Sequence, residues 1–291
     1  ADSAFAGCSP ELVLLGGTQS YTQQYAERTG LLFCDPTNFE YAVSGDNAII
    51  MRYTGSETRV VVPSTIYGIR VSAIGKHAFA SSAVETVVLA SGIAQIEEGA
   101  FASCYALREV TLPQSLKTVG DLAFHDCGVL STVNFGDGLE SIGKQAFSYD
   151  RALTDVALPD SLRSIGDSAF EGCIGLTQIN IPAHISHLPE GVFYYCDRLA
   201  EVAFAEGLAS LGARVFEGCV SLANVKLPDS VTQIGFRAFA GCAALSTIYV
   251  PSKTVVIDPS AFGETDDIAP LANPDLVLIG APGSAVEAIA E

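Results

Sequence analysis

The chain has 291 residues, with 33 acidic against 15 basic side chains, so its net charge is −18. This charge repels nucleic-acid phosphates and anionic lipid, which argues against nucleic acid or a membrane surface as partner. Hydrophobic residues make up 49% of the chain and no apolar run is long enough to cross a bilayer, so we expect a folded, soluble segment that does not insert into a membrane. Its first residues lack the regions of a signal peptide, which favours a mature segment or a piece of a longer chain.

Residues 1–35 are predicted to be the C-terminal cap of a preceding repeat array. Residues 4–8 resemble the tail of a repeat coil, and residues 10–16 match residues 274–280 at an offset of 264, which also carries Ser20 onto Ser284 and Ala26 onto Ala290. We expect a strand followed by a helix in both places. Residues 268–291 are accordingly predicted to be a C-terminal strand–helix cap, and the parent protein is expected to carry at least two arrays.

Residues 36–70 are predicted to form an N-terminal β cap. Apolar and polar residues alternate over 39–43, a turn follows at 44–47, and a second strand is expected at 48–51. A further strand is expected at 59–62.

Residues 71–267 contain a repeat of about 23 residues. It is marked by nine phenylalanines, one spaced by 22 and the others by 23 residues: Phe79, Phe101, Phe124, Phe147, Phe170, Phe193, Phe216, Phe239 and Phe262. A fixed period of this length is typical of a solenoid, in which each coil buries its apolar stripe against its neighbours.

The residue spacing within each coil predicts one short strand and one short turn. In one unit Leu176, Ile179 and Ile181 have the spacing of a strand, and the stretch from Ile165 to Cys173 predicts a single turn of helix or 3₁₀ helix. Glycine recurs four residues before the phenylalanine, where we expect a chain reversal that needs permissive backbone angles. The predicted fold class is α/β: a solenoid with a curved parallel sheet, short helical or 3₁₀ turns, and caps at both ends.

The pattern I-G-x-x-A-F-x-x-C-x-x-L-x-x-V-x-L-P, as in residues 165–182 and 234–251, resembles the BspA-like class of bacterial leucine-rich repeat proteins. The resemblance implies a curved repeat domain of a secreted or cell-surface protein, adhesion or host-protein binding, and no enzymatic activity. Departures are local: Glu97, Pro189 and Asp258 replace the glycine, and Val192 and Val215 replace the alanine.

Seven of the eight cysteines lie three residues after a register phenylalanine, and only Cys34 lies outside this column. The position also holds Ser82, Asp150 and Thr265, so small size and hydrogen bonding are the shared properties. We therefore predict free, partly buried thiols that bond to the backbone of adjacent coils, and no disulfide framework.

The predicted binding surface is the concave face of the sheet, where two columns of outward side chains are small, polar and mildly acidic. The candidate ligand-binding residues are Glu109, Thr111, Thr132, Asn134, Asp155, Gln178, Asn180, Glu201, Asn224, Lys226, Thr247 and Tyr249.

Other motifs are better explained by the repeat. Residues 138–144 approach a phosphate-binding loop but lie in repeat register, with Gln145 where a magnesium-binding hydroxyl is required. His184 and His187 are too few for a metal site, and Glu264, Asp266 and Asp267 lack the ligand pattern of a calcium loop. We predict no catalytic residue, no metal and no cofactor.

The leading hypothesis is a non-catalytic extracellular or cell-surface module that binds a host or matrix protein through the concave sheet. Contacts with other repeat arrays of the same parent chain are also expected. Two alternatives stay open: a structural spacer that projects other domains from the cell surface, and a glycan-binding module that uses Tyr194, Tyr195 and nearby loops.

Overall fold

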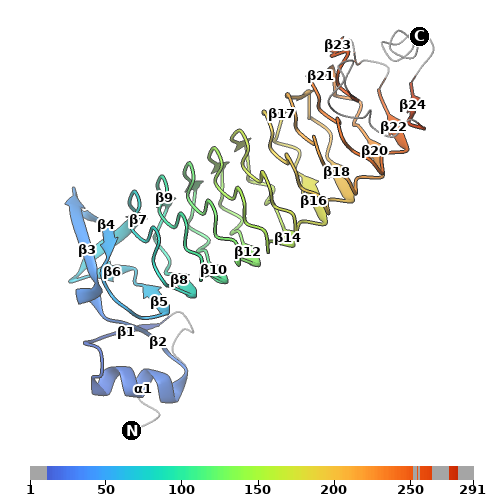
Figure 1. Ribbon diagram of the computed structural model, residues 1–291. Helices are drawn as coiled ribbons and strands as arrows, with labels where there is room; N and C mark the ends of the chain where they lie inside the picture. The colour runs from blue at the N-terminus through green and yellow to red at the C-terminus, as the bar shows by residue number, and fades with distance from the viewer. Residues whose placement is uncertain (1–11, 252–253, 255, 264–274, 281–291) are drawn as a thin grey trace.

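The computed structural model describes residues 12–251, 254, 256–263 and 275–280. Figure 1 shows an elongated stack of coils that begins at an N-terminal helix and ends at the C-terminal strands. This arrangement confirms the predicted solenoid. Within the described ranges the only helices are α1 (Tyr21–Thr29) and the short 3₁₀ segment η1 (Pro36–Asn38).

The N-terminal unit consists of β1 (Val13–Leu15), α1 and β2 (Leu32–Cys34), with the two strands parallel. Helix α1 begins after Ser20, whose Oγ accepts a hydrogen bond from Gln23 N at 3.2 Å, and ends at Gly30, which has a φ of 71°. A strand followed by a helix is therefore present here, as the sequence predicts. That this unit caps a preceding array stays a prediction.

The next segment forms a small sheet at the start of the array. β3 (Phe39–Ser44) and β4 (Asn47–Tyr53) make the predicted antiparallel hairpin, and β4 pairs in parallel with β7 (Ile69–Ile74). β6 (Thr65–Ile66) pairs with β7, whereas β5 (Arg59–Val62) pairs with the first repeat strand. The long sheet of the array therefore begins at β5.

Each repeat coil contributes two strands, and corresponding strands of successive coils are parallel. The longer strands are those that the sequence predicts: β8 (Thr86–Leu89), β10 (Glu109–Thr111), β12 (Thr132–Asn134), β14 (Asp155–Val156), β16 (Gln178–Ile181), β18 (Glu201–Phe204), β20 (Asn224–Lys226) and β22 (Thr247–Tyr249). The sequence analysis missed a second, two-residue strand in each coil: β9 (Gln95–Ile96), β11 (Thr118–Val119), β13 (Ser141–Ile142), β15 (Ser164–Ile165), β17 (His187–Leu188), β19 (Ser210–Leu211), β21 (Gln233–Ile234) and β23 (Val256–Ile257).

Both ladders are interrupted in the same part of the array. Pairing of the longer strands stops between β18 and β20, and pairing of the short strands stops between β15 and β17. In the regular coils the residue after the short strand donates its N–H to the preceding coil, as Gly166 N does to Ile142 O at 2.8 Å. Pro189 occupies this position after β17 and has no N–H, which accounts for the second interruption.

At the C-terminal end β24 (Val277–Ile279) pairs in parallel with β22. This is the strand half of the predicted cap. The helical half lies outside the described residues, as do Cys8, Glu264, Asp266 and Asp267.

The connecting turns are not helical, and the prediction of a helical or 3₁₀ turn was wrong for the described coils. Residues two before and two after the register phenylalanines from Phe79 to Phe239 have positive φ, for example 54° at Ser168 and 68° at Gly172. Between them, alternate N–H groups bond to the next coil instead of along the turn: Phe147 N donates to Ala169 O at 2.8 Å and Tyr149 N donates to Glu171 O at 2.7 Å. The other N–H groups bond along the turn to the residue three before them, as Ser148 N does to Gln145 O at 3.2 Å, so bonds between coils replace only part of the bonding that a continuous helix would have.

The expected reason for the recurrent glycine was also wrong. The glycines four residues before the phenylalanines are not among those with positive φ. A Cβ on Gly212 would lie 2.8 Å from Leu188 O, and one on Gly120 would lie 2.9 Å from the carbonyl carbon of Glu97. Glycine is needed because successive coils approach too closely for a side chain.

The core is a continuous stack of the register phenylalanines. Adjacent rings lie 4.8 to 5.8 Å apart and nearly parallel, as in the Phe101–Phe124 pair with an interplanar angle of 2°. Tyr53 extends the stack by one ring at the N-terminal end, 5.1 Å from Phe79. The substitutions Val192 and Val215 are fully buried without interrupting this stack.

The cysteine column lies beside this stack, and its thiols are more buried than we expected. The six described members are fully buried: Cys104, Cys127, Cys173, Cys196, Cys219 and Cys242. Each thiol donates to the carbonyl oxygen of the register phenylalanine one coil earlier, for example Cys173 Sγ to Phe147 O at 3.1 Å. The predicted backbone bonding is confirmed, and the described cysteines are free.

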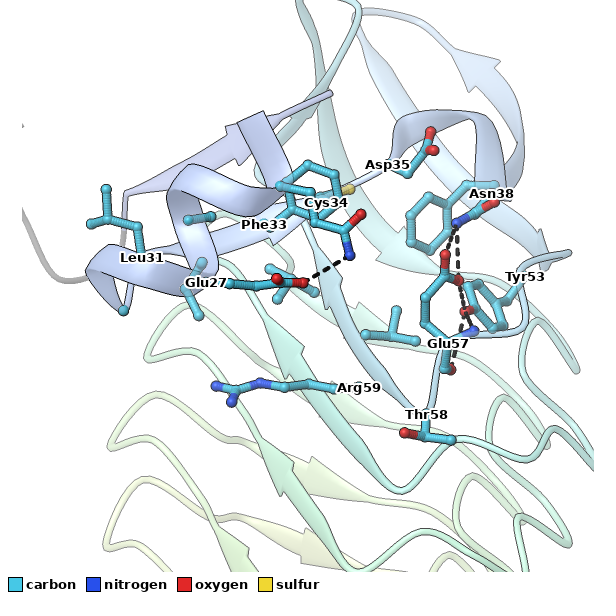
Figure 2. A pocket seen from close by; sticks show the side chains of 17 residues that line it. Glu27, Leu31, Phe33, Cys34, Asp35, Asn38, Tyr53, Glu57, Thr58 and Arg59 are labelled. Atoms are coloured by element: carbon cyan, nitrogen blue, oxygen red, sulfur yellow. Dashed lines mark hydrogen bonds between the residues drawn. The ribbon is translucent and has the colours of Figure 1, made fainter. Parts of the chain in front are cut away.

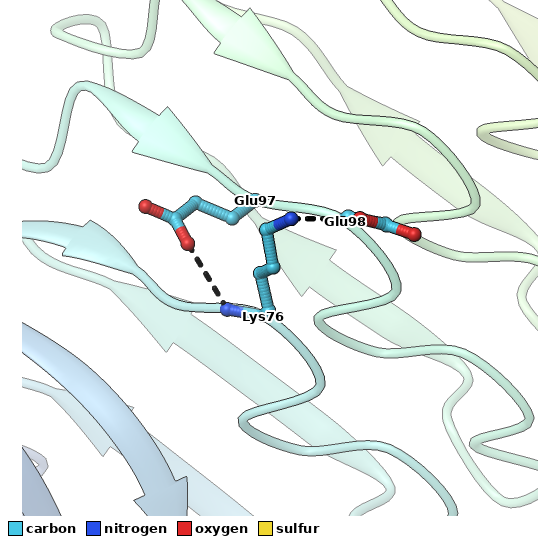
Figure 3. Close-up of polar contacts among 3 residues, drawn as sticks. All are labelled: Lys76, Glu97 and Glu98. Carbon is cyan, nitrogen blue, oxygen red and sulfur yellow. Dashed lines mark hydrogen bonds and ion pairs between the residues drawn. The ribbon is translucent and has the colours of Figure 1, made fainter.

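Ion pairs join neighbouring coils on the surface near the short strands. Lys76 Nζ lies 2.9 Å from Glu98 Oε2, and Lys76 N donates to Glu97 Oε2 at 3.2 Å (Figure 3). Lys117 and Glu140 form a similar pair at 2.9 Å. These side chains are 45% to 64% exposed, so each pair contributes little to stability.

Candidate functional site

The predicted ligand-binding residues form two columns on one face of the array, which we call the strand face. Along β16, Gln178 and Asn180 are exposed whereas Ile179 and Ile181 are buried, because successive side chains of a strand point to opposite faces. In the register of the sheet Asp155 lies beside Gln178, and Gln178 lies beside Glu201. Eleven of the twelve candidates are exposed, and Thr247 is partly exposed.

A shallow hollow of about 280 Å³ lies on this face across β16, β18, β20 and β22. Ala203 is the smallest outward side chain in its column here, between Asn180 on one side and Lys226 on the other. Six predicted residues line the hollow: Gln178, Asn180, Glu201, Asn224, Lys226 and Tyr249.

Most polar side chains around the hollow are uncommitted, and Asn224 Oδ1 accepts a hydrogen bond from Ser246 Oγ at 3.4 Å. Within the described part of the chain, Glu201 and Lys226 form no ion pair, and Gln178 and Asn180 form no side-chain hydrogen bond. Tyr249 is 47% exposed at one end of the hollow. The site therefore offers a carboxylate, an ammonium group, amides and one aromatic ring around a small apolar floor.

Of the six remaining candidates, Thr247 lies on β22 but does not line the hollow. Glu109, Thr111, Thr132 and Asn134 lie on β10 and β12, and Asp155 lies on β14. The hollow does not include them. They continue the same polar face towards the N-terminus.

A second cavity, of about 570 Å³, lies between the N-terminal unit and the β cap (Figure 2). Sequence analysis gave no sign of it. Its polar wall is a hydrogen-bond network: Asp35 accepts from Thr18 N at 2.6 Å and from Thr37 Oγ1 at 2.6 Å, and Glu57 accepts from Asn38 Nδ2 at 3.0 Å.

The network binds the N-terminal unit to the array. Burial alone would raise the pKa of Asp35, but hydrogen bonds from Thr37 and Thr18 outweigh it and hold the pKa at about 2. Tyr53 Oη donates to Glu57 Oε2 at 2.6 Å, which connects the network to the aromatic stack. These acceptors are already satisfied by the protein, so their arrangement is structural.

The loop-like segment 138–144 and the histidines considered as metal ligands are ordinary parts of the repeat. Ser141 and Ile142 form β13 inside the loop-like segment 138–144, and Lys144 Nζ lies 3.9 Å from Asp167 Oδ2 in the surface ion pairs. His187 lies on β17 with its Nδ1 2.6 Å from Ser210 Oγ. Among the described residues no group of three or more potential ligands could hold a metal ion, and no helix is long and apolar enough to cross a membrane.

Comparison with known proteins places these features in a family context. The model of the BspA type leucine rich repeat region matches six copies, over residues 72–200 and 186–276. Among solved structures, the leucine rich repeat protein of T. pallidum is 34% identical with a TM-score of 0.63, and the match covers 64% of this chain and 88% of that chain.

Two further structures are similar. A leucine-rich repeat protein from Bacteroides ovatus is 21% identical, with 78% of this chain and 90% of that chain covered and a TM-score of 0.33. A leucine rich cell surface protein from Faecalibacterium prausnitzii is 21% identical, with coverage of 86% and 94% and a TM-score of 0.35. No curated protein matches the chain. Leucine-rich repeat proteins are typically non-enzymatic modules for protein interaction, and these matches indicate no catalytic family.

Proposed function

Because this chain belongs to the BspA-type leucine-rich repeat family, we propose that it is a non-catalytic module of an extracellular or cell-surface protein, which binds a host or matrix protein through its strand face. The family supports a role in protein interaction. The strand face as the binding surface, the surface location and the role in adhesion are our proposals.

The hollow around Ala203 is the observation that carries this proposal. Protein ligands gain affinity where a side chain enters a depression and where buried polar groups find partners. Glu201 and Lys226 form no ion pair within the described residues, so a ligand with a complementary pair of charges would not first have to break one. A hollow of about 280 Å³ accommodates a single side chain, and Tyr249 supplies an aromatic contact at its edge.

A solid-phase binding experiment tests the proposal. The full chain is applied to immobilised purified matrix and plasma proteins, and any captured ligand is then titrated with the double variant Asp155→Lys and Glu201→Lys. Both residues are exposed, so we expect the variant to melt like the unaltered chain but to lose binding.

The matched control is the double variant Asp160→Lys and Glu206→Lys, which makes the same change in charge at exposed acids outside the strand-face columns. We expect this control to bind normally. Equal binding by the two double variants would contradict recognition through the strand face. The absence of any bound protein from the whole panel would instead favour the structural spacer.

A further inference from the structure

The turns that carry the register phenylalanines form an outer ridge of the array, which we call the turn ridge. At the position after the phenylalanine the first two coils carry Ala80 and Ala102, but the coils of Phe193 and Phe216 carry large groups there. In that part of the ridge Tyr194, Tyr195, Arg214, Glu217 and Phe236 lie together, and we call them the ridge patch.

Arg214 contacts both an acidic and an aromatic side chain within the ridge patch. Its Nε lies 3.7 Å from Glu217 Oε2, and its guanidinium carbon lies 5.8 Å from the centre of the Phe236 ring. Glu217 is itself buried and paired with Arg237 Nη2 at 2.8 Å. Among the described residues Arg214 has no ion-pair partner other than Glu217, and 40% of its side chain is exposed. Its guanidinium group is a fork of the kind that binds a carboxylate through two hydrogen bonds.

Tyr194 and Tyr195 provide an aromatic surface beside this fork. Their ring centres are 4.2 Å apart, and Tyr195 is 51% exposed. The Tyr195 ring lies against Gly218 of the next coil, where any Cβ would collide with it. Burial and a hydrogen bond that the Tyr194 hydroxyl donates to Tyr195 raise the pKa of Tyr194 to about 12, so this hydroxyl stays protonated at neutral pH.

We propose that the ridge patch binds a saccharide residue that carries a single carboxylate, with the carboxylate on Arg214 and the sugar ring against Tyr194 and Tyr195. The net charge of −18 disfavours dense polyanions but allows one carboxylate at an arginine. This site lies on a different face from the proposed protein-binding hollow, so either can fail without the other.

An acidic peptide fits the ridge patch less well. Peptides in extended form gain much of their affinity from hydrogen bonds to open backbone groups. On this ridge the backbone donors are used between coils: Tyr195 N donates to Glu217 O at 2.9 Å, and Arg214 N donates to Phe236 O at 2.8 Å. Side chains alone are left for the ligand, which suits the hydroxyl and carboxyl groups of a sugar.

Isothermal titration of the full chain with 3′-sialyllactose, which has one carboxylate, tests the site, and lactose is the neutral comparison. We expect saturable binding of 3′-sialyllactose in the millimolar range and none of lactose. Arg214→Lys keeps the charge but loses the fork, so we expect affinity to fall by about tenfold or more. Tyr195→Ala should also weaken binding, and the control Arg163→Lys, at an exposed site outside the ridge, should not.

Four results would overturn the proposal, provided that the variants melt like the unaltered chain. They are no saturable binding of 3′-sialyllactose, equal binding of lactose, equal affinity of the Arg214→Lys and Arg163→Lys variants, or displacement of 3′-sialyllactose by a glutamate-rich peptide at equal concentration.

Discussion

Asp150 offers the sharpest test of how the coils are held together. It occupies the cysteine column and is fully buried, and its Oδ1 accepts a hydrogen bond from Cys127 N at 2.8 Å. Its Oδ2 has no hydrogen-bond partner among the described residues. In the coils with cysteine, the thiol donates to the register phenylalanine one coil earlier, which for position 150 is Phe124. A carboxylate cannot donate this bond, whereas a neutral carboxyl can.

We therefore expect Asp150→Asn to stabilise the protein at about pH 7. The amide oxygen can accept from Cys127 N, and the amide nitrogen can donate to Phe124 O. A buried polar atom without a partner costs about 1–3 kcal/mol, so the free energy of unfolding should rise by about that amount. For a chain of this size each kcal/mol corresponds to an increase of about 2–4 °C in melting temperature.

The effect should depend on pH in a definite direction. Burial raises the pKa of Asp150 well above its usual value of 3.8, so the folded protein binds the proton more tightly than the unfolded chain does. The stability from Asp150 is complete below pH 3.8 and is lost as the pH rises towards the folded-state pKa. The advantage of the Asn variant should therefore be large at about pH 7 and small at about pH 4.

Thermal unfolding followed by circular dichroism at these two pH values measures the difference. Asp150→Cys is the matched control, because it restores the residue that most coils use. The reasoning is refuted if Asp150→Asn lowers the melting temperature at pH 7, or if the difference between variant and unaltered chain is the same at both pH values.

Three further outcomes follow from the same packing. Phe170→Ala should lower the free energy of unfolding, measured by urea denaturation, by about 3–5 kcal/mol, because the rings of Phe147 and Phe193 lie only 5.4 and 5.8 Å away. A loss as small as that of a surface substitution would contradict the stacking of these rings. Gly212→Val should also destabilise, since its Cβ would meet Leu188 O, whereas the same change at Gly128, which has open space, should be tolerated. Burial raises the pKa of four column cysteines, Cys173, Cys196, Cys219 and Cys242, and to about 12 at Cys242, so a thiol reagent at pH 8 should modify these four only on unfolding; their rapid modification in the folded chain would count against their burial.

The sequence was sufficient to predict the solenoid because the repeat spacing alone determines which side chains stack. Phe170 and Cys173 recur at the same place in successive coils, so a parallel stack brings like residues together, and their burial follows. The outward column containing Gln178 and Glu201 follows for the same reason, because these positions alternate with buried ones.

What the sequence did not predict depends on contacts between coils. The short strand at Ser164 and Ile165 has only two residues, too few to show an alternating pattern, and it exists because its neighbours pair with it. The turn around Phe147 was expected to be helical because its spacing within one coil is helical, but every second N–H group in it bonds to the next coil. Ala203 gave no signal by itself, since the hollow is lined by side chains from four different strands that only the stacking of the coils brings together.

The irregular coils of the array are also the ones that carry both proposed sites. Pro189 removes a hydrogen bond where the short-strand ladder is interrupted, and the longer ladder is interrupted between β18 and β20, which the hollow spans. The ridge patch lies on the turns of the coils of Phe193, Phe216 and Phe239, in the same part of the array. The phenylalanine stack continues through these coils at about 5.5 Å spacing, so the core does not require the interruptions.

Departures from a regular pattern that the core does not require are expected where a protein binds something else. On this reasoning, Pro189→Gly should restore the regular pattern of the short-strand ladder and stabilise the chain, as measured by its melting temperature. It should also weaken ligand binding at the hollow if the interruption of the short-strand ladder shapes that site. A Pro189→Gly variant with unchanged stability and unchanged binding would show that the interruption and the hollow are independent.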